Sequence, residues 1–405
     1  MPNHTPNTGF IALGLPNTTL ERIARLGFVE PTPIQSQGIP AIMDGADIIG
    51  LAQTGTGKTL AFAAPMSALL ERGALGLVLA PTRELAQQIE EVFRALGVHV
   101  ALLVGGTPIR PQIAQLRKYP DVVVATPGRL IDHLDQRTID LRSVTMLVLD
   151  EADRMLDIGF APAIKRIVSE GPEDRQTMLF TATFGKEVEK LANRYLYNPR
   201  RIEVSRAGSA ATEVEQELMI LKFDEKQTML KRVLNDFSGS VLVFSRTKHG
   251  ARKLARLVHN NGHDAAELHS DRTLEQRRAA LNGFKTGRVR VLIATDIAAR
   301  GIDVKDVGMV LNYDVPEKAE DYVHRIGRTG RAGAKGRALT FATPDQHSEV
   351  RSIERLIQLS IPLSNHSSGK LSAKSSNAKG NRSRRPRRGR EARIGYKFHS
   401  RTGAA

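Results

Sequence analysis

The sequence predicts an α/β protein with two doubly wound parallel-sheet domains in tandem, followed by a disordered basic tail. Short apolar runs of strand type alternate with helical runs from about residue 47 to 205, and the alternation resumes over residues 214–364. Near-continuous apolar runs separated by helices are typical of parallel strands that helices cover on both faces. A length of 405 residues also exceeds that of one ordinary domain.

The first predicted domain, residues 1–205, begins with a helical pattern. Residues 18–26 have the spacing of an amphipathic helix, which Gly27 ends. The Pro-Thr-Pro-Ile-Gln segment at 31–35 should be extended or form a turn, because each proline pushes the residue before it out of the helical region. Buried strands are then expected at 47–51, 76–80, 98–103, 122–125, 145–149 and 177–180.

Residues 52–59 lie between the first strand and a helical run, which is the context that a phosphate-binding loop requires. Two glycines permit close backbone approach and positive φ, so that loop amides can point at phosphate oxygens. Lys58 can reach the β- and γ-phosphates, and the Thr59 hydroxyl can ligate Mg²⁺. A small-residue turn with a chance Lys-Thr is the alternative. We therefore predict a nucleoside triphosphate site formed by Ala52, Gln53, Thr54, Gly55, Thr56, Gly57, Lys58 and Thr59.

Strand 145–149 ends in the acidic run Asp150-Glu151-Ala152-Asp153. Ligands of open α/β sheets lie beyond the carboxyl ends of the strands, so these acids should lie beside the phosphate loop. We expect Asp150 to hold Mg²⁺ and Glu151 to orient or deprotonate the attacking water. An acid pair after a strand is by itself most often a solvated turn, and the upstream loop is what favours catalysis.

The second half of the chain has a linker, a second domain and a tail of different composition. Small residues predict a linker at 206–213, and strands are expected at 240–244, 290–294 and 308–312 in a domain spanning 214–364. Residues 365–405 are too polar to bury a core and should be disordered. Residues 366–405 contain twelve Lys or Arg against the single acid Glu391, and so carry +11 of the net charge of +16. Such a tail indicates a polyanionic partner, most often nucleic acid.

Composition excludes several classes of protein. The chain has no cysteine, which excludes disulfides, thiolate zinc sites and cysteine nucleophiles and fits a reducing compartment. No run of about 18 apolar residues suggests a membrane span. The first residues show neither a secretory signal nor an Arg-rich transit pattern. We therefore expect a cytoplasmic protein that makes no contact with a membrane.

Several motifs in chain order resemble those of the DEAD-box RNA helicases of helicase superfamily 2, and compact bacterial members of the RhlE type in particular. The resemblance covers about residues 10–340. It implies two RecA-like domains, ATP and Mg²⁺ as cofactors, RNA-stimulated ATP hydrolysis, and local, non-processive unwinding of duplexes when the domains close on RNA. Ribonucleoprotein or RNA-decay partners would fit such a protein. The motifs are 27–28, 31–35, 52–59, 81–86, 105–106, 126–129, 150–153, 181–183, 243–247, 294–303 and 324–331.

The resemblance gives five further residues a role in binding or hydrolysing the nucleotide. Gln35 would hydrogen-bond the adenine edge while Phe10 stacks on the ring, although an ordinary hydrophobic staple is the alternative for Phe10. Asp303 would position the ribose. Arg328 and Arg331 would reach across the cleft to the γ-phosphate as arginine fingers, which are worth roughly 10³–10⁵ in kcat in related enzymes.

The resemblance also implies an RNA-facing surface and a coupling segment. Glycines, hydroxyls, helix N-termini and arginines contact the nucleic-acid backbone without reading its sequence. Thr181, Ala182 and Thr183 would link the nucleotide site to strand separation. The residues implied to contact RNA are Pro81, Thr82, Arg83, Gly105, Gly106, Thr126, Pro127, Gly128, Arg129 and Thr295.

Three positions depart from the family pattern. Thr181 replaces the usual serine, Ser270 a glycine and Leu274 a glutamine. Gln276 is a candidate to replace that glutamine by a shift along the chain, and the alternative is weaker RNA binding there. Two other functions compete with the helicase interpretation. They are a DNA-directed translocating helicase and a non-catalytic RNA-binding scaffold.

Deletion of residues 366–405 should weaken RNA binding and flatten its salt dependence, because single-strand affinity falls by about 0.7 log units per log unit of salt for each phosphate neutralised. The measurement is RNA affinity across a salt series for the full chain and the truncated chain. An unchanged slope would favour a solubilising or protein-docking tail instead.

Overall fold

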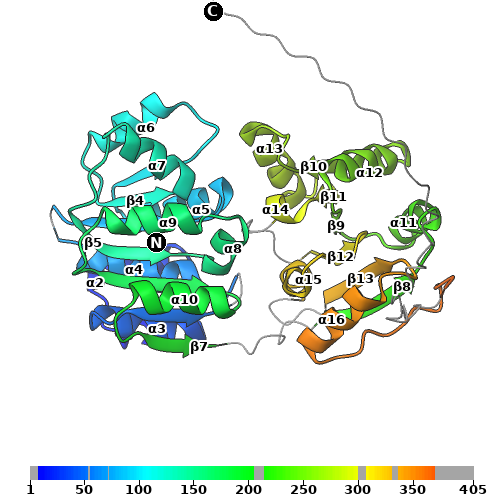
Figure 1. Cartoon of the computed structure of the whole chain (residues 1–405), viewed down its shortest axis with the longest axis horizontal. Helices are drawn as coiled ribbons and strands as arrows, with labels where there is room; N and C mark the ends of the chain where they lie inside the picture. The colour runs from blue at the N-terminus through cyan, green and yellow to red at the C-terminus, as the bar shows by residue number, and fades with distance from the viewer. Residues whose placement is uncertain are drawn as a thin grey trace, which may run out of the picture.

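Two parallel β-sheets lie side by side, each flanked by helices (Figure 1). In this computed structural model, residues 8–52, 55–71, 73–204, 214–299, 307–330 and 336–369 are described. The predicted linker and most of the predicted tail lie outside these ranges. Every strand pair in both sheets is parallel, which confirms the predicted fold class.

The first sheet has the strand order β3-β4-β2-β5-β6-β1-β7. Its strands are β1 (Ile48–Leu51), β2 (Leu75–Leu79), β3 (Val100–Leu103), β4 (Val122–Ala125), β5 (Val144–Leu149), β6 (Gln176–Thr181) and β7 (Arg200–Glu203). Its helices are α1 (Thr8–Ile11), α2 (Asn17–Arg25), α3 (Pro33–Met43), α4 (Lys58–Leu69), α5 (Arg83–Ala95), α6 (Ile109–Leu116), α7 (Pro127–Asp135), α8 (Ala152–Asp157), α9 (Ala161–Ser169) and α10 (Lys186–Tyr195).

The second sheet has the order β10-β11-β9-β12-β13-β8. Its strands are β8 (Val214–Ile220), β9 (Val241–Phe244), β10 (Ala265–Leu268), β11 (Val291–Ala294), β12 (Met309–Asn312) and β13 (Gly336–Ala342). Its helices are α11 (Glu225–Asp236), α12 (Lys248–Asn260), α13 (Leu274–Lys285), α14 (Asp296–Ala299), α15 (Ala319–Ile326) and α16 (His347–Ile357).

Successive side chains of the central strands pack into two separate cores, one on each face of the sheet. Val122 and Val124 belong to one cluster of the first domain, whereas Val123 belongs to the other. Because successive side chains of a strand point to opposite faces, a strand covered on both sides must be apolar throughout. This explains why the central strands were visible as continuous apolar runs.

The Pro-Thr-Pro-Ile-Gln segment corrects one sequence prediction. Residues 31–35 were expected to be extended or to form a turn, but α3 begins at Pro33. Proline is favoured at the first helical position, where its missing N–H would have no partner in the helix. Thr32 and Gln35 form a capping box, in which Thr32 N–H donates to Gln35 Oε1 at 2.9 Å. Gln35 is therefore a helical residue with a fixed orientation.

The chain after α16 covers the outer edge of β8. Leu218 N–H donates to Pro362 O and Ser364 N–H to Leu218 O, both at 2.8 Å. Ser368 N–H donates to Ile220 O at 2.9 Å. The packed chain thus continues to Gly369, five residues beyond the predicted boundary at 364. No helix among the described residues is long and apolar enough to cross a membrane.

Asp47 holds together the starts of three segments of the first sheet. Its carboxylate accepts hydrogen bonds from Thr177 N–H at 2.6 Å and Tyr197 N–H at 2.7 Å, and its carbonyl accepts from Arg200 N–H at 2.8 Å. The residue is 9% exposed. The carboxylate therefore satisfies amides that water does not reach freely.

Asp47→Ala should lower the free energy of unfolding by roughly 2–4 kcal/mol, because two sheltered amides lose their acceptor and each such loss costs about 1–3 kcal/mol. Asp44→Ala is the matched control, since the Asp44 side chain is 61% exposed and forms a surface ion pair with Arg200. Chemical denaturation of both variants makes the measurement. Equal, small losses would show that Asp47 does not have this role.

Candidate functional site

The phosphate loop connects β1 to α4 beside the C-terminal end of β6. Gly55 and Gly57 have φ of +86° and +91°, a conformation that glycine adopts without strain. Gln35 Nε2 donates to Gly57 O at 3.0 Å, and a Cβ on Gly57 would lie 2.3 Å from that nitrogen. The loop is thereby tied to the capping box of α3. Gln53 and Thr54, two predicted loop residues, lie outside the described residues.

Lys58 places a buried positive charge at the start of α4. Its side chain is 6% exposed, and its Nζ has no hydrogen-bond partner among the described residues. A buried ammonium without partners is costly unless a ligand supplies acceptors. Together with the positive-φ glycines and the start of α4, it fits a bound phosphate chain.

The acids after β5 lie at the neighbouring strand ends, as predicted. Asp150 is 2% exposed, and burial, opposed by the Lys58 ammonium, raises the pKa of its carboxyl to about 6. Glu151 is 6% exposed, with a φ of 49°, and its carboxylate lies 3.5 Å from Arg154 Nη1. Thr59, the second predicted metal ligand, is half-buried in the first turn of α4. A carboxylate and a hydroxyl beside a phosphate site suit Mg²⁺.

Asp153 joins this acidic run to the segment after β6. Its Oδ2 accepts from Ala182 N–H at 3.2 Å and from both Thr183 N–H and Thr183 Oγ1 at 2.9 Å. Burial acts to raise the pKa of Asp153, but His324, Lys58 and these hydrogen bonds hold it below its ordinary value. The Thr181 hydroxyl donates to Thr183 O at 2.8 Å. Threonine at 181 therefore keeps a hydroxyl interaction within the coupling segment.

Phe10 lies in the core of the first domain with its side chain completely buried. Helix α1 is held against the Pro-Thr-Pro segment, since a Cβ on Gly9 would lie 2.6 Å from Pro31 Cδ. This burial matches the hydrophobic-staple alternative for Phe10. Stacking of the ring on adenine stays a prediction.

The motifs of the first domain that are predicted to face RNA converge around Arg83. Thr82 caps α5 by accepting from Leu85 N–H at 3.3 Å, after Pro81. A Cβ on Gly106 would lie 1.8 Å from Arg83 Nη1, so the glycine at 106 makes room for the guanidinium. Burial, together with Arg277 and Arg129 and against Glu84, lowers the pKa of Arg83. Arg277 and Arg129 near Arg83 add positive charge of the kind that suits phosphates.

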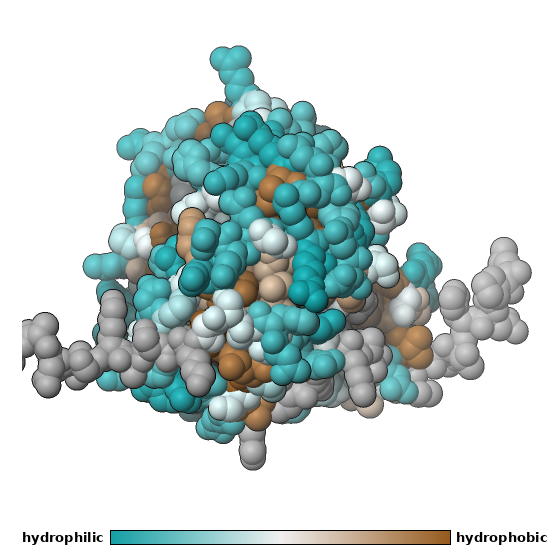
Figure 2. Space-filling model, turned by 90° about the vertical axis from the view of Figure 1, so that its right-hand side faces the viewer, coloured by the Kyte–Doolittle hydropathy of each residue, from teal (hydrophilic) through white to brown (hydrophobic). Residues whose placement is uncertain are grey.

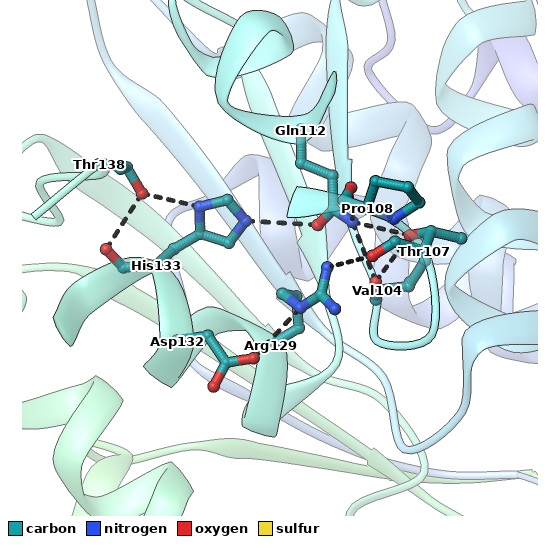
Figure 3. Close-up of polar contacts among 8 residues, drawn as sticks. All are labelled: Val104, Thr107, Pro108, Gln112, Arg129, Asp132, His133 and Thr138. Atoms are coloured by element: carbon teal, nitrogen blue, oxygen red, sulfur yellow. Dashed lines mark hydrogen bonds and ion pairs between the residues drawn. The ribbon is translucent and has the colours of Figure 1, made fainter. Parts of the chain in front are cut away.

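A buried histidine network holds two of these motifs together (Figure 3). The His133 ring nitrogens lie 2.7 Å from Thr138 Oγ1 and 3.3 Å from Gln112 Oε1. Gln112 Nε2 donates to Val104 O at 3.0 Å and to Thr107 Oγ1 at 2.8 Å. Burial and Arg129 lower the pKa of His133, which favours the neutral ring.

The same network places Arg129. Thr126 and Pro127 begin α7, with Gly128 in its first turn, and Arg129 Nη1 donates to Thr107 O at 3.0 Å. The glycine loop 104–107 and the start of α7 thus form one unit. Neither Gln112 nor His133 was predicted from the sequence. Their only signal was polar residues at positions of α6 and α7 that face the interior.

The second domain supplies a buried arginine clamp. Arg325 Nε and Nη2 donate to the two carboxylate oxygens of Asp296 at 2.6 and 2.7 Å, and Nη1 donates to Asn312 Oδ1 at 3.1 Å. Arg328 is 3% exposed at the end of this segment, and Thr295 N–H donates to Leu268 O at 3.1 Å. Asp303 and Arg331, the other predicted residues of this domain, lie outside the described residues.

Direct contacts cross between the two domains. Arg277 Nη2 lies 3.0 Å from Glu84 Oε2, with side chains 13% and 5% exposed. Arg278 Nε donates to Gln87 Oε1 at 3.2 Å, and Lys318 pairs with Asp157. These contacts join α13 to α5 and the start of α15 to α8. The two domains therefore meet both at α5, which carries residues predicted to contact RNA, and at α8, which follows the predicted catalytic acids.

The departures after β10 have a partial structural account. Gln276 Oε1 accepts from Thr273 N–H at 3.1 Å in a capping box. One lone pair of this oxygen is thus used at the start of α13, and a contact of Gln276 with RNA stays a prediction. Arg278, the residue after Arg277, donates a hydrogen bond to Gln87 of the first domain. The side chain of Leu274 is outside the described residues.

Comparisons with known proteins point to one family. The DEAD/DEAH box helicase model matches residues 32–191, and the Helicase conserved C-terminal domain matches residues 225–333. The chain is 45% identical over 370 residues to DEAD-box ATP-dependent RNA helicase 30 of Arabidopsis thaliana, covering 87% of this chain and 62% of that protein. It is 44% identical over 369 residues to helicase 20 of the same organism, covering 87% and 74%.

A solved structure extends the likeness to both domains. S. cerevisiae Dbp5 bound to RNA and ADP BeF3 matches with a TM-score of 0.79 and 31% identity, covering 88% of this chain and 95% of that chain. A score of that size over nearly the whole of both chains requires a similar placement of the two sheets.

Gly106→Ala should weaken RNA binding by roughly tenfold, because the added Cβ displaces the Arg83 guanidinium and one charged contact is worth about 1.5–3 kcal/mol. Gly45→Ala is the control, since Gly45 has a similar φ of +80° but no atom near its Cβ position. Both variants carry the backbone strain, and only Gly106→Ala should raise the RNA concentration required for binding. Equal RNA affinity of the two variants would contradict this role.

Proposed function

The chain belongs to the DEAD-box family of ATP-dependent RNA helicases, and from this premise we propose how its residues divide the work of RNA-stimulated ATP hydrolysis. The observation that carries the proposal is the buried Lys58 ammonium beside the acidic strand end, for which the described part of the chain supplies no hydrogen-bond acceptor. The first domain holds ATP, and the second completes the site when both domains bind one RNA.

In the first domain, the phosphate chain lies over residues 52–59, where Lys58 and the loop amides replace water. Gln35 reads the adenine edge, which makes the site selective for ATP. Asp150 and Thr59 hold Mg²⁺, which neutralises charge on the phosphates when it is bound. Glu151 orients or deprotonates the attacking water. The backbone of Glu151 is in the left-handed conformation at the end of β5, which fixes the direction of its carboxylate.

The second domain supplies the remaining charge. Arg328 and Arg331 neutralise the γ-phosphate in the transition state, and Asp303 positions the ribose. The Arg325–Asp296 clamp supports this role because it fixes the helix that precedes Arg328. His324 lowers the pKa of Asp153 from across the boundary, which supports an electrostatic link between this helix and the acidic run.

RNA favours closure because its binding surface is shared. The contacts of Arg277 and Arg278 with α5 and the likeness to RNA-bound Dbp5 support an arrangement close to the closed state. A ligand that contacts both domains shifts the population toward that state. Closure then bends one strand of a duplex and expels the other, and product release reopens the cleft.

We further infer that the protein is cytoplasmic, because a chain without cysteine fits a reducing compartment.

Two other functions make different predictions. A DNA-directed translocase would be stimulated equally by DNA, whereas contacts with the RNA backbone and 2′-OH groups should favour RNA. A non-catalytic scaffold would bind RNA without turnover. Lys58, Glu151 and Arg328 favour the catalytic interpretation, because a scaffold needs none of the three.

The deciding experiment is ATP hydrolysis without nucleic acid, with single-stranded RNA and with the matched DNA, for wild type and Glu151→Gln. RNA should stimulate wild type selectively, and Glu151→Gln should lose at least about 100-fold in kcat, since general-base catalysis contributes roughly 10²–10⁴. Unchanged RNA affinity of the variant is the control for folding. Equal stimulation by DNA, or tight RNA binding without turnover in wild type, would overturn the proposal.

A further inference from the structure

A groove runs along the open edge of the second sheet, away from the nucleotide site. It lies between α12, the edge strand β10 and α13, and encloses about 750 Å³. Ala265 and Ala266 line it from the strand, and Ala279 from α13. These short side chains leave the space between the two helices unfilled. The volume lies in the range of ligand sites, about 300–1,000 Å³.

The rim of this groove is positively charged. Arg252, Arg256 and Arg272 line it, and the acid Glu267 is paired with Arg272. Arg252 and Arg256 lie one turn apart on the same face of α12, about 6 Å along its axis. Arg256 is exposed and has no ion pair among the described residues. A row of guanidiniums at this spacing fits successive phosphates of a nucleic-acid strand.

One end of the groove adjoins the RNA-facing surface. Gln276 lines the groove, and the next residue, Arg277, pairs with Glu84 beside Arg83 across the domain boundary. At the same end, Asp271 lies 2.8 Å from Lys248 and 3.7 Å from Arg252. A strand that leaves the cleft past Arg277 would meet Arg272 and Arg252 next.

We propose that this groove, the α12–α13 groove, binds the backbone of single-stranded RNA that continues beyond the cleft. The inference rests on the proposed function, since it extends the RNA path of that site. The described lining residues include no Phe, Tyr or Trp, and His259 carries their one ring, so we assign binding chiefly to phosphates and not to base stacking. The outer side of the second domain is mostly hydrophilic (Figure 2), which disfavours an apolar partner on that side.

The test compares two RNA lengths in the full-length protein. One RNA fills only the cleft, and two longer ones carry about eight further nucleotides at the 5′ or the 3′ end, within the usual single-strand site size of about 4–16 nucleotides. Arg256→Glu should bind the short RNA as wild type does. It should bind one of the two longer RNAs roughly threefold to tenfold more weakly, with a salt slope reduced by about 0.7 for one lost phosphate contact.

Lys253→Glu is the matched control, because Lys253 is exposed on the same helix and undergoes the same charge change but does not line the groove. It should leave both affinities unchanged. ATP hydrolysis stimulated by the short RNA should be equal in all three proteins, which separates a failure here from a failure of the proposed function.

Equal affinities of wild type and Arg256→Glu for both longer RNAs would overturn the proposal. Equal weakening by Arg256→Glu and Lys253→Glu would reduce the effect to general charge and would also overturn it. If poly-glutamate binds wild type but not Arg256→Glu while RNA affinity is unaffected, the groove accepts an acidic protein segment instead.

Discussion

The buried ammonium of Lys58 is the constraint around which the first domain is arranged. A charge in that position is tolerated because two acids share the strand edge with it and because the site is open to a ligand that carries oxygens. Burial raises the pKa of Asp150 to about 6, against the effect of Lys58. The charges at this site are thus only partly compensated by one another. In the proposed function, a nucleotide would supply acceptors for Lys58, and Mg²⁺ would compensate the acids.

The parallel sheets explain why the site is divided. Each sheet presents its loops at the carboxyl ends of its strands, and one such edge leaves the far side of a ligand open. In the proposed mechanism, the residues that complete the chemistry therefore come from the second sheet. The Glu84–Arg277 pair is largely buried and connects α13 to α5, the helix that begins at Arg83. In the proposed mechanism, RNA binding and domain closure are therefore parts of one equilibrium, and the lowering of the Asp153 pKa by His324 supports a link to the nucleotide site.

The sequence predicted the central strands and the motif residues because both leave strong local signals. Strands with only apolar residues were predicted, whereas β7, β8 and β10 at the sheet edges and the interior β13, which carries Arg337 and Thr340, mix polar with apolar residues and were missed. Pro33 was assigned to a turn because proline disfavours a helical conformation of the residue before it. The Thr32–Gln35 capping box, which starts a helix at Pro33, was not considered. The Gln112–His133 network could not be predicted, since it depends on two helices being brought together by the sheet.

The strand orders of the two sheets suggest why RNA should follow the edge at β10. Reading inward from one edge, β3-β4-β2-β5-β6-β1 in the first sheet corresponds to β10-β11-β9-β12-β13-β8 in the second. At the far edge, β7 covers β1, and the segment around Leu363 takes the equivalent place beside β8. At the near edge, β3 leads to the glycine loop beside Arg83, and β10 leads to the loop that carries Arg272. The α12–α13 groove therefore occupies the edge that corresponds to the proposed RNA-facing edge of the first domain. An RNA strand that follows both edges would contact equivalent elements of the two sheets.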